Sequence, residues 1–447
     1  MQPRVLVLLC LVFGLALVPR SVASGSSSAG EGGSGASHGT TYYVSPSGSD
    51  SSDGRSDTTP FRTIQHAADL TNPGDAVLIM PGTYTASYSA AGQPDVVAIT
   101  RSGTSAAYIT YKAATATRPV ILNQASWNGI DVRGASYIRI EGLEIAGNSA
   151  HITMDTARSM GLDQPATNGG CVIVQPDSTG IIPHHVVIQN NVVHDCAGGG
   201  IASNKADYIV IAYNTVYNNA LWSKYGNSGI SIYESRMSDR LPGYHNIVLS
   251  NIAYGNKELL PAGSTITDGN GIIIDDLDNT QSNNVIYTGR TLVSNNLSYN
   301  NGGRGIHIFY SRNVDVINNT TFNNNSVLPG KDNGELSAIF ANSCVFFNNI
   351  AFAREQHGAT YTYGNGPDVV FTYNLYFNGP VSAVGSGDLI ANPLFVDPAK
   401  ANFHLRSQSP AIDSGIGNVN TVLAPSTDLA GAPRPHGKMY DRGAYEE

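Results

Sequence analysis

Between residues 129 and 310 the chain repeats a short unit in which a glycine is followed by alternating apolar and variable residues. The unit occurs as GIDVRG from Gly129, GIASNK from Gly200, GISIYE from Gly229, GIIIDD from Gly271 and GIHIFY from Gly305. Alternation with a period of two is typical of strands that are buried on one face. The runs are too short, and too often interrupted by Gly and Asn, for helical repeats. The pattern therefore predicts short strands, each belonging to one coil of a repeated structure.

A second repeat places an aromatic ring or a histidine three positions after an asparagine. Its pairs are Asn191/His194, Asn214/Tyr217, Asn251/Tyr254, Asn296/Tyr299, Asn319/Phe322, Asn349/Phe352 and Asn374/Phe377. The shortest spacings between these asparagines are 23 to 30 residues, the period of a solenoid, and the longer gaps indicate loop insertions. Stacked coils of this kind form parallel sheets. We expect aliphatic and aromatic ladders inside the coils, and asparagine side chains that hydrogen bond along the stack at the turns.

The first residues have the pattern of a secretory signal peptide. Arg4 precedes the apolar run VLVLLCLVFGLALV, and Ser21, Val22 and Ala23 form a small-x-small cleavage site, so residues 1–23 are expected to be removed. Residues 24–40 are mostly Gly, Ser and Ala, which predicts a flexible linker. No second apolar run is long enough to span a bilayer. We therefore expect a secreted or periplasmic protein without a transmembrane segment.

Composition and charge narrow the class of ligand. The chain has 447 residues, of which 41% are hydrophobic and only 13% are charged, about half the usual charged share. Its formal net charge of −9 disfavours nonspecific binding to nucleic acid, which needs a basic surface. An anionic ligand would need a local cation. Three cysteines follow the signal segment, too few for a disulfide scaffold, and we expect small buried residues with at most one bridge.

The two ends of the repeated region carry a family resemblance. TYYVSPSGSD and TPFRTIQHAADLTNPGDAVLIMPGTY, from Thr41 on, look like the entry segment of the right-handed parallel β-helix proteins of the pectate-lyase-like superfamily. NPLFVDPAKANFHLRSQSPAID, near the end, resembles the closing segment of secreted bacterial β-helix proteins. The resemblance implies an all-β, single-stranded right-handed parallel β-helix over residues 41–385, with an irregular closing segment over residues 386–447. It also implies an N-terminal capping helix, with Thr59 as its N-cap and Pro60 at its first position.

Aligning the strands on their glycines predicts which side chains share a face. One column holds Lys205, Glu234, Asp276 and Tyr310, the next holds Asn204, Tyr233, Asp275 and Phe309, and a third holds Ala202, Ser231, Ile273 and His307. Adjacent coils lie about 4.8 Å apart. We therefore expect Lys205, Glu234 and Asp276 to stack outside the sheet with Asp275 nearby, while Ile272 and Ile274 point inward. Carboxylates at this spacing must be protonated, paired with Lys205 or Arg304, or bridged by a metal ion.

The resemblance and the acidic column together imply a carbohydrate-active protein with a polysaccharide as its partner, and we expect a monomer. The first hypothesis is a polysaccharide lyase that cleaves a uronate-containing polymer by β-elimination, with Ca²⁺ held by Glu234, Asp275 and Asp276 and Lys205 as the base. The candidate catalytic residues are Lys205, Glu234, Asp276, His307 and Arg304, and the candidate substrate-binding residues are Tyr233, Phe309, Tyr310 and Trp222. The lyase comes first because Lys205 falls into the column of a chain that is otherwise poor in lysine.

Two alternatives remain open. In a glycoside hydrolase, Glu234 and Asp276 would act as the paired carboxylates. In a polysaccharide-binding or structural β-helix protein, the acids would have no catalytic role, since Asp275 and Asp276 would simply end a strand and Asp268 would cap a loop. GRGIH replaces the Gly-His-Gly of polygalacturonases, and the Asp-Asp-Gly continuation of calcium-dependent pectate lyases is missing. Lys257 and the adjacent Glu258 are expected to be a solvated pair.

Overall fold

The computed structural model describes residues 39–86, 95–328, 330 and 333–447. The chain divides into two units, residues 1–37 and 38–447, and the described residues belong to the second unit. The expected signal peptide over residues 1–23 and nearly all of the expected linker over residues 24–40 lie outside the described residues. Within the described ranges, no helix is long and apolar enough to cross a membrane.

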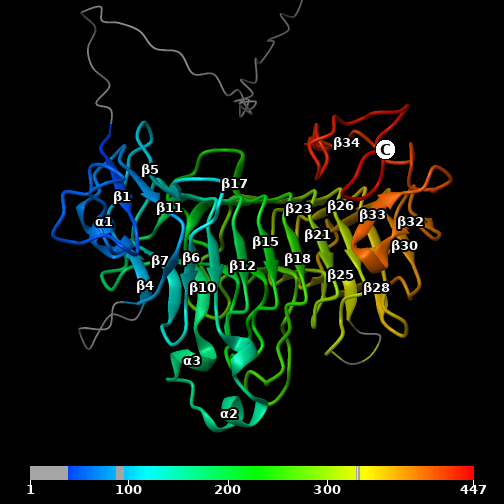
Figure 1. The fold of residues 1–447 in the computed structure, drawn as a ribbon. Helices are drawn as coiled ribbons and strands as arrows, with labels where there is room; N and C mark the ends of the chain where they lie inside the picture. The colour runs from blue at the N-terminus through cyan, green and yellow to red at the C-terminus, as the bar shows by residue number, and fades with distance from the viewer. Residues whose placement is uncertain (1–38, 87–94, 329, 331–332) are drawn as a thin grey trace, which may run out of the picture. The chain divides into compact units, whose positions relative to one another are not determined.

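Short strands stack into three long parallel sheets, and each coil contributes one strand to sheet C, then one to sheet A and one to sheet B (Figure 1). The strands of sheet A are β1 Thr41–Val44, β2 Ala76–Ile79, β5 Ile109–Ala113, β8 Ile138–Glu141, β11 His184–Gln189, β14 Asp207–Ala212, β17 Tyr244–Leu249, β20 Arg290–Ser294, β23 Val314–Ile317, β26 Val345–Phe347 and β29 Val370–Thr372. Those of sheet B are β3 Thr83–Tyr84, β6 Val120–Leu122, β9 Glu144–Ala146, β12 Val192–His194, β15 Thr215–Tyr217, β18 Ile252–Tyr254, β21 Leu297–Tyr299, β24 Thr320–Phe322, β27 Ile350–Phe352, β30 Leu375–Phe377 and β31 Leu389–Ile390. Those of sheet C are β4 Asp95–Ile99, β7 Asn128–Arg133, β10 Gly170–Gln175, β13 Ile201–Asn204, β16 Ile230–Tyr233, β19 Ile272–Asp275, β22 Ile306–Phe309, β25 Gly334–Ile339 and β28 Gly358–Tyr363. The expected all-β parallel solenoid is confirmed.

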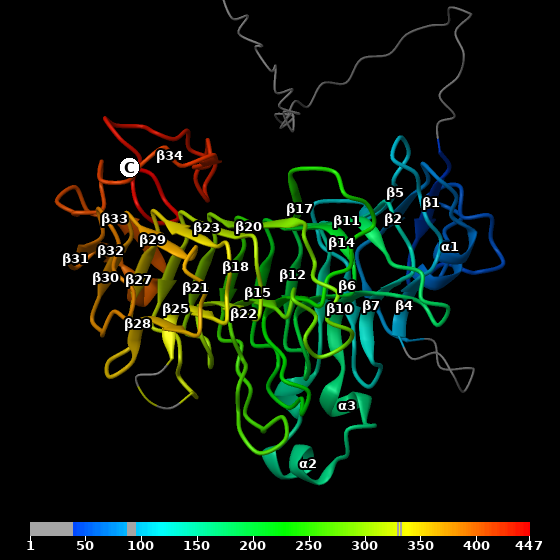
Figure 2. The same cartoon turned by 180° about the vertical axis from the view of Figure 1, so that it is seen from behind.

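The described helices are short and lie at the ends or in the loops of the coils (Figures 1 and 2). They are α1 Ile64–Leu70, α2 Met154–Ser159, α3 Pro165–Asn168 and the 3₁₀ turns η1 Ser149–His151 and η2 Pro398–Lys400. The capping helix α1 is present, but its N-cap is Thr63, whose hydroxyl accepts a hydrogen bond from the His66 N–H. The expected start at Thr59 and Pro60 is wrong because Phe61 still pairs with Val44 in a strand-like bridge, which delays the helix.

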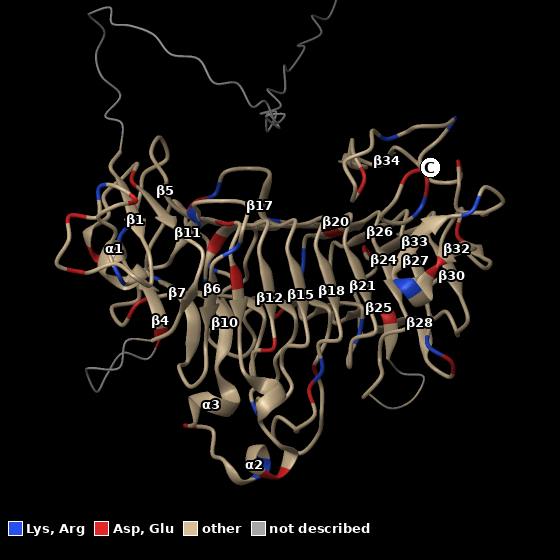
Figure 3. Ribbon diagram, in the orientation of Figure 1, with Lys and Arg blue, Asp and Glu red and all other residues tan. Residues whose placement is uncertain are grey.

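The alternation of the strands places their apolar residues as expected. Ile272 and Ile274 of β19 are fully buried in the central core, whereas Ile273 lies on the opposite face of the strand and lines a cleft. Charged residues are sparse along the coils (Figure 3). The core is therefore an apolar column along the coils, and the outer face of sheet C carries different chemistry.

Two asparagine ladders run inside the coils. The first contains the predicted asparagines, all of them buried: Asn191, Asn214, Asn251, Asn296, Asn319, Asn349 and Asn374. Each side-chain amide donates one hydrogen bond to the side-chain oxygen of the next member and another to a backbone carbonyl, and for the last asparagine, Asn374, the next member is Asp388. For Asn296 the acceptors are Asn319 Oδ1 at 3.0 Å and Val248 O at 2.9 Å. The predicted ladder is confirmed. Asn296, Asn318, Asn319 and Asn324, each of which begins an Asn-x-Ser/Thr sequon, are buried.

A second ladder, absent from the sequence-based prediction, contains Asn219, Asn256, Asn301 and Asn324 and ends at Glu335. It explains the repeated glycines. A Cβ added to Gly271 would lie 2.0 Å from Ser298 Oγ and 2.7 Å from Asn301 Nδ2. The glycines directly before β13, β16, β19 and β22 therefore make room for the second ladder.

The aromatic ladder lies on the outer face of sheet B, and not inside the coils as expected. Tyr217 and Tyr254 stack with ring centroids 4.9 Å apart, at the outward positions of β15 and β18. Further along the stack, Phe395 and Phe403 of the C-terminal segment pack onto the same face. The expected irregular C-terminal segment is thus present, with two antiparallel hairpins formed by β32 Phe395–Asp397 with β33 Asn402–Leu405 and by β34 Asn418–Val419 with β35 Val422–Leu423. The parallel stack before it reaches Ile390 in β31, past the expected boundary at residue 385.

One disulfide joins Cys171 of β10 to Cys196, which follows β12. Cys344 is free and buried. Both observations agree with the expectation of small buried cysteines and at most one bridge.

Candidate active site

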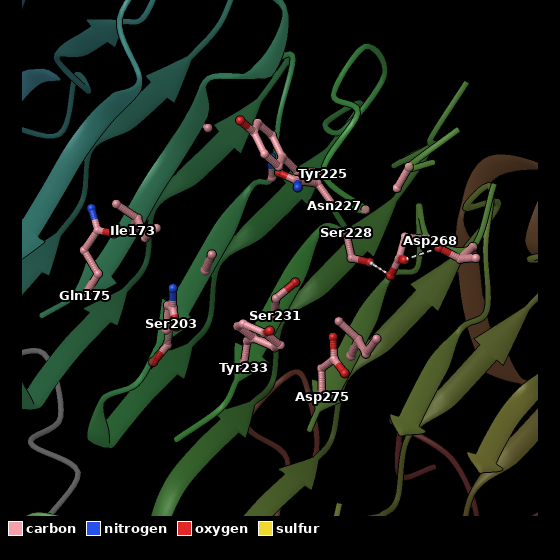
Figure 4. Close-up of a pocket in the computed structure, with 18 of the residues that line it drawn as sticks. Ile173, Gln175, Ser203, Tyr225, Asn227, Ser228, Ser231, Tyr233, Asp268 and Asp275 are labelled. Carbon is pink, nitrogen blue, oxygen red and sulfur yellow. Dashed lines mark hydrogen bonds between the residues drawn. The ribbon is translucent and has the colours of Figure 1, made fainter. Parts of the chain in front are cut away.

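The outer face of sheet C forms the floor of a cleft of about 990 Å³. Two rows of outward side chains cross the strands β7, β10, β13, β16, β19 and β22. The first row is Asp131, Ile173, Ala202, Ser231, Ile273 and His307, and the second is Arg133, Gln175, Asn204, Tyr233, Asp275 and Phe309. Figure 4 shows Gln175, Tyr233 and Asp275 along the second row. The two columns predicted to contain Asp275 and His307 are therefore confirmed.

Three insertions pack against one another to form a wall beside this floor. They are residues 147–169, 218–229 and 255–271. Trp222 of the second insertion donates its indole N–H to the Ser149 carbonyl at 2.8 Å and packs between Ala157 and Leu260. Its side chain is only 8% exposed and does not line the cleft, so the structure gives Trp222 a packing position and not the expected contact with substrate.

A different aromatic residue of the same insertion faces the cleft. Tyr225 is 53% exposed, lines the cleft and is fixed by a 3.0 Å hydrogen bond from its hydroxyl to the Leu162 carbonyl. Trp127, in the turn before β7, also lines the cleft. Exposed rings held in this way offer flat surfaces to a sugar. The sequence drew attention to the loop LWSKYGN, but only the packing of the insertions distinguishes Tyr225 from Trp222.

The centre of the floor brings together three polar side chains that have a buried atom without a hydrogen-bond partner within the described part of the chain. These atoms are Asp275 Oδ1, Arg304 Nε and His307 Nδ1. All three side chains line the cleft. An unpaired buried polar atom costs about 1 to 3 kcal/mol, so these atoms mark the centre of the floor as a candidate site for a polar ligand.

Burial shifts the pKa values of two of these groups, Asp275 and His307, in opposite directions. Burial raises the pKa of Asp275 well above its ordinary value, and the charges of Asp268, Asp276 and Glu234 raise it further. Burial lowers the pKa of His307 well below its ordinary value, the Arg304 charge lowers it further, and a backbone hydrogen bond with Ser337 opposes the shift. Burial therefore favours the protonated, neutral form of the Asp275 carboxyl group and the neutral form of the His307 imidazole.

Arg304 supplies the positive charge of the centre. Burial lowers its pKa to about 10, while the nearby Asp268 raises it, so the guanidinium stays charged at neutral pH. Its Nη1 donates to the Thr267 carbonyl at 3.1 Å, which orients the side chain and leaves Nε free. Asp268 in turn accepts hydrogen bonds from Ser228 and Asn270, and Figure 4 shows Ser228 beside it.

Glu258 lies behind this centre and is not the solvated residue that the sequence suggested. Its side chain is fully buried, and its Oε2 accepts hydrogen bonds from the N–H groups of Thr267 and Asp268 at 3.2 and 2.9 Å. Burial raises its pKa to about 7, with a contribution from Asp268. Glu258 thus holds the loop that carries Asp268 in place.

The predicted column of Lys205, Glu234, Asp276 and Tyr310 does not line the cleft. All four residues have positive φ angles, between 42° and 52°, because they form the turn from sheet C to sheet A. The strand alternation ends at this turn. Lys205 Nζ lies 3.2 Å from Glu234 Oε2, and the Asp276 carboxylate accepts hydrogen bonds from Thr280 and Gln281. Of the candidate site residues, Tyr233, Asp275, Arg304, His307 and Phe309 line the cleft.

The donor set does not fit the expected Ca²⁺ site. Both Asp276 oxygens are occupied by the turn, and Glu234 is paired with Lys205. Within the residues that the structure describes, no group of three or more His, Cys, Asp or Glu side chains is placed to hold a metal ion. Calcium dependence stays a prediction from the sequence.

The far end of the cleft has a second polar cluster, which the sequence-based analysis missed. Arg133 forms ion pairs with Asp95 at 2.7 Å and with Asp131 at 2.5 Å. Burial and the Asp131 charge raise the pKa of Asp95 to about 6. The signal was present in GIDVRG, because extending the strand alignment to this unit places Asp131 in the row of His307 and Arg133 in the row of Asp275.

Comparison with known proteins identifies the family. Residues 42–333 match the family model described as "Pel9A-like, right handed beta helix region". The chain belongs to this family. Among solved structures it is similar to pectate lyase Pel9A, with a TM-score of 0.56 and 19% identity over 91% of this chain and 96% of that one.

Two other solved structures show weaker similarity. XylC in complex with xylose has a TM-score of 0.47 and 14% identity over 91% of this chain and 99% of that chain. A GH136 lacto-N-biosidase from Eubacterium ramulus has a TM-score of 0.43 and 15% identity over 78% of this chain and 62% of that chain. No curated protein matches the chain. The family match and the likeness to Pel9A give the protein a right-handed β-helix fold of the kind that carbohydrate-active enzymes use.

Proposed function

We propose that the protein is a polysaccharide lyase that cleaves a uronate-containing polysaccharide by β-elimination in the cleft on sheet C. The observation that supports this is that a guanidinium, an imidazole and a carboxyl group, each with a buried polar atom that has no described partner, line the same cleft. We propose further that the substrate is met outside the cell, as the expected signal peptide implies.

The three groups match the steps of the reaction. Arg304 binds the carboxylate of the uronate, which acidifies the C5 proton next to it. His307 Nδ1 takes that proton, the C5–H electrons form the C4–C5 double bond, and the C4–O bond breaks. Asp275 donates its proton to the departing glycosidic oxygen. General acid–base groups placed in this way contribute about 10² to 10⁴ in rate.

Substrate binding would also prepare the base. The positive charge of Arg304 is one cause of the lowered pKa of His307. A uronate carboxylate on Arg304 offsets that charge and so raises the pKa of His307 toward the range of an effective base. The base would therefore become stronger only when an acidic sugar is bound.

A glycoside hydrolase is the second candidate, and one observation favours it. Among the charged groups that raise the pKa of Asp275, Asp268 has the largest effect, so the two carboxyl groups are close. Their environments differ. Asp275 as the acid and Asp268 as the base or nucleophile would form the pair that hydrolysis needs. In this alternative the neutral His307 has no catalytic role.

One experiment separates the candidates. The protein is incubated with acidic and neutral polysaccharides, with and without chelator, and both the ultraviolet absorbance of unsaturated uronates and the reducing ends are followed. Absorbing products from an acidic polymer support the lyase. Reducing ends without absorbance would replace it with the hydrolase, and the absence of both would favour a binding protein. Loss of activity with chelator would support the Ca²⁺ site that the sequence predicts.

A further inference from the structure

The polar cluster at the far end of the cleft is built as a binding surface. Asn128, Arg133 and Gln175 line the cleft, whereas Asp95 and Asp131 are 3% and 0% exposed and do not line it. The two buried carboxylates therefore act as supports for the three residues in front of them.

Each support fixes one cleft-lining amide. Asn128 donates its side-chain N–H to Asp95 at 2.7 Å, and Gln175 donates to Asp131 at 2.9 Å. Arg133 donates to both carboxylates through Nη2 and to Asp131 through Nε. This leaves Arg133 Nη1 without a hydrogen-bond partner in the described ranges, beside two amide groups whose oxygens are free to accept. Asp131 Oδ1 is buried and also lacks a partner there.

We propose that Asn128, Arg133 and Gln175 form a distal subsite that binds an acidic sugar unit of the same polymer, with its carboxylate on Arg133 and its hydroxyls on the two amides. This inference rests on the proposed function. Because Nε and Nη2 of Arg133 already donate to Asp95 and Asp131, the N–H groups of Nη1 are the ones left to form a charged hydrogen bond with the sugar carboxylate. Preorganisation by Asp95 and Asp131 lowers the entropic cost of binding.

The position of the subsite determines how long a substrate must be to reach it from the centre of the cleft. Arg133 and Asp275 stand in the same outward row, and the strands β7, β10, β13, β16 and β19 separate them by four steps. At about 4.8 Å per step the two residues are roughly 19 Å apart along the coils. A short oligosaccharide bound at the centre does not reach Arg133, whereas a long one does. The subsite therefore favours acidic chains that are long enough to span both sites.

The test is a length series of uronate oligosaccharides, titrated by calorimetry into the His307→Ala protein so that cleavage does not interfere. Adding Arg133→Ala should weaken binding of oligomers that span both sites about tenfold or more, the effect of losing a charged hydrogen bond, and leave the disaccharide unchanged. Arg139→Ala is the matched control, because Arg139 lies in the same coil but on the outer face of sheet A. Equal losses at all lengths, or no loss at any length, would overturn the subsite.

A second variant tests whether weaker binding comes from the lost contact or from a loss of folding. Arg133→Ala leaves Asp95 and Asp131 unpaired, so Gln175→Ala, which keeps both ion pairs, should show a smaller loss with the same length dependence. Failure of the subsite and failure of the proposed function give different results. If the wild-type protein makes absorbing products but its variants bind oligomers of every length normally, only the subsite is contradicted. If the wild-type protein neither cleaves nor binds any uronate oligomer, both the subsite and the proposed function are contradicted.

Discussion

Polar side chains stack from coil to coil in two regions of this β-helix, and the two regions treat them in opposite ways. Inside the coils, each asparagine of the first ladder has partners in the neighbouring coils, as Asn296 does with Asn319 and Val248. On the outer face of sheet C, Asp275, Arg304 and His307 each keep a buried atom without a partner in the described structure. Satisfied stacks stabilise the fold, whereas unsatisfied ones carry free energy that a ligand can recover. Mutations should therefore separate activity from stability.

The largest effect should come from His307. If it is the base, His307→Ala should lower turnover on the acidic substrate by about 10² to 10⁴. The melting temperature should fall less than for a change in the ladder, since Nδ1 bonds to no described residue and only the hydrogen bond with the Ser337 backbone is lost. Steady-state kinetics and a thermal melt measure both. His404→Ala, on β33 outside the cleft, is the control. Full turnover of His307→Ala would remove the base from the mechanism.

The opposite result is expected within the ladder. Asn296→Ala removes hydrogen bonds to two neighbouring coils at a fully buried position, and should cost about 1 to 3 kcal/mol of unfolding free energy without changing the turnover of the folded protein. Denaturant unfolding measures the cost, with the exposed Asn402→Ala as control. An unchanged stability would mean that the ladder does not hold the coils together.

Asp275 should show the cost of keeping a functional group buried. Its folded pKa lies above the unfolded value of 3.8, so the stabilising effect of its protonated form is present below that pH and is lost as pH rises through the folded pKa. Asp275→Asn cannot ionise. The variant should therefore match the wild type near pH 4 and melt a few degrees higher at neutral to alkaline pH, while losing activity. A difference in melting temperature that does not change with pH would contradict the assigned protonation state.

The smallest effect on turnover should come from Lys205, the base that the sequence favoured. Because its ammonium group pairs with Glu234 in the turn and does not line the cleft, Lys205→Ala should keep turnover within about twofold. The same kinetic assay on the true substrate measures it. A loss of a hundredfold or more would return the base to Lys205 and would contradict the role given to His307.

The sequence was sufficient wherever a repeat constrains each residue. The period of two fixed the outward rows of Tyr233, Asp275 and His307, and the recurring asparagines indicated the first ladder. It was insufficient where the backbone leaves the strand. Glu234 and Asp276 follow the strands by one residue, but their positive φ angles take them out of the row, and no alternation pattern reports such a turn.

The loops were the second point at which the sequence was insufficient. Trp222 and Tyr225 belong to one loop, and only contacts with Ser149 and Leu162, more than sixty residues earlier, decide which ring is buried. The burial of Glu258 depends in the same way on how its insertion folds back on itself. Such contacts bring together residues that no local pattern connects.

The first asparagine ladder also gives the stack of coils a direction and an end. The side-chain oxygen of each internal asparagine accepts from the asparagine of the coil before it, and its backbone and side-chain N–H groups donate to the side-chain oxygen in the coil after it. Every internal coil therefore meets the same bonding pattern on both sides. Asp388 closes the series, because its carboxyl group accepts from the Asn374 backbone N–H and offers no amide to a further coil. The length of the protein can therefore change during evolution, or by design, through duplication of an internal coil such as the one between Asn296 and Asn319. A coil added beyond Asp388 would find no donor to continue the ladder.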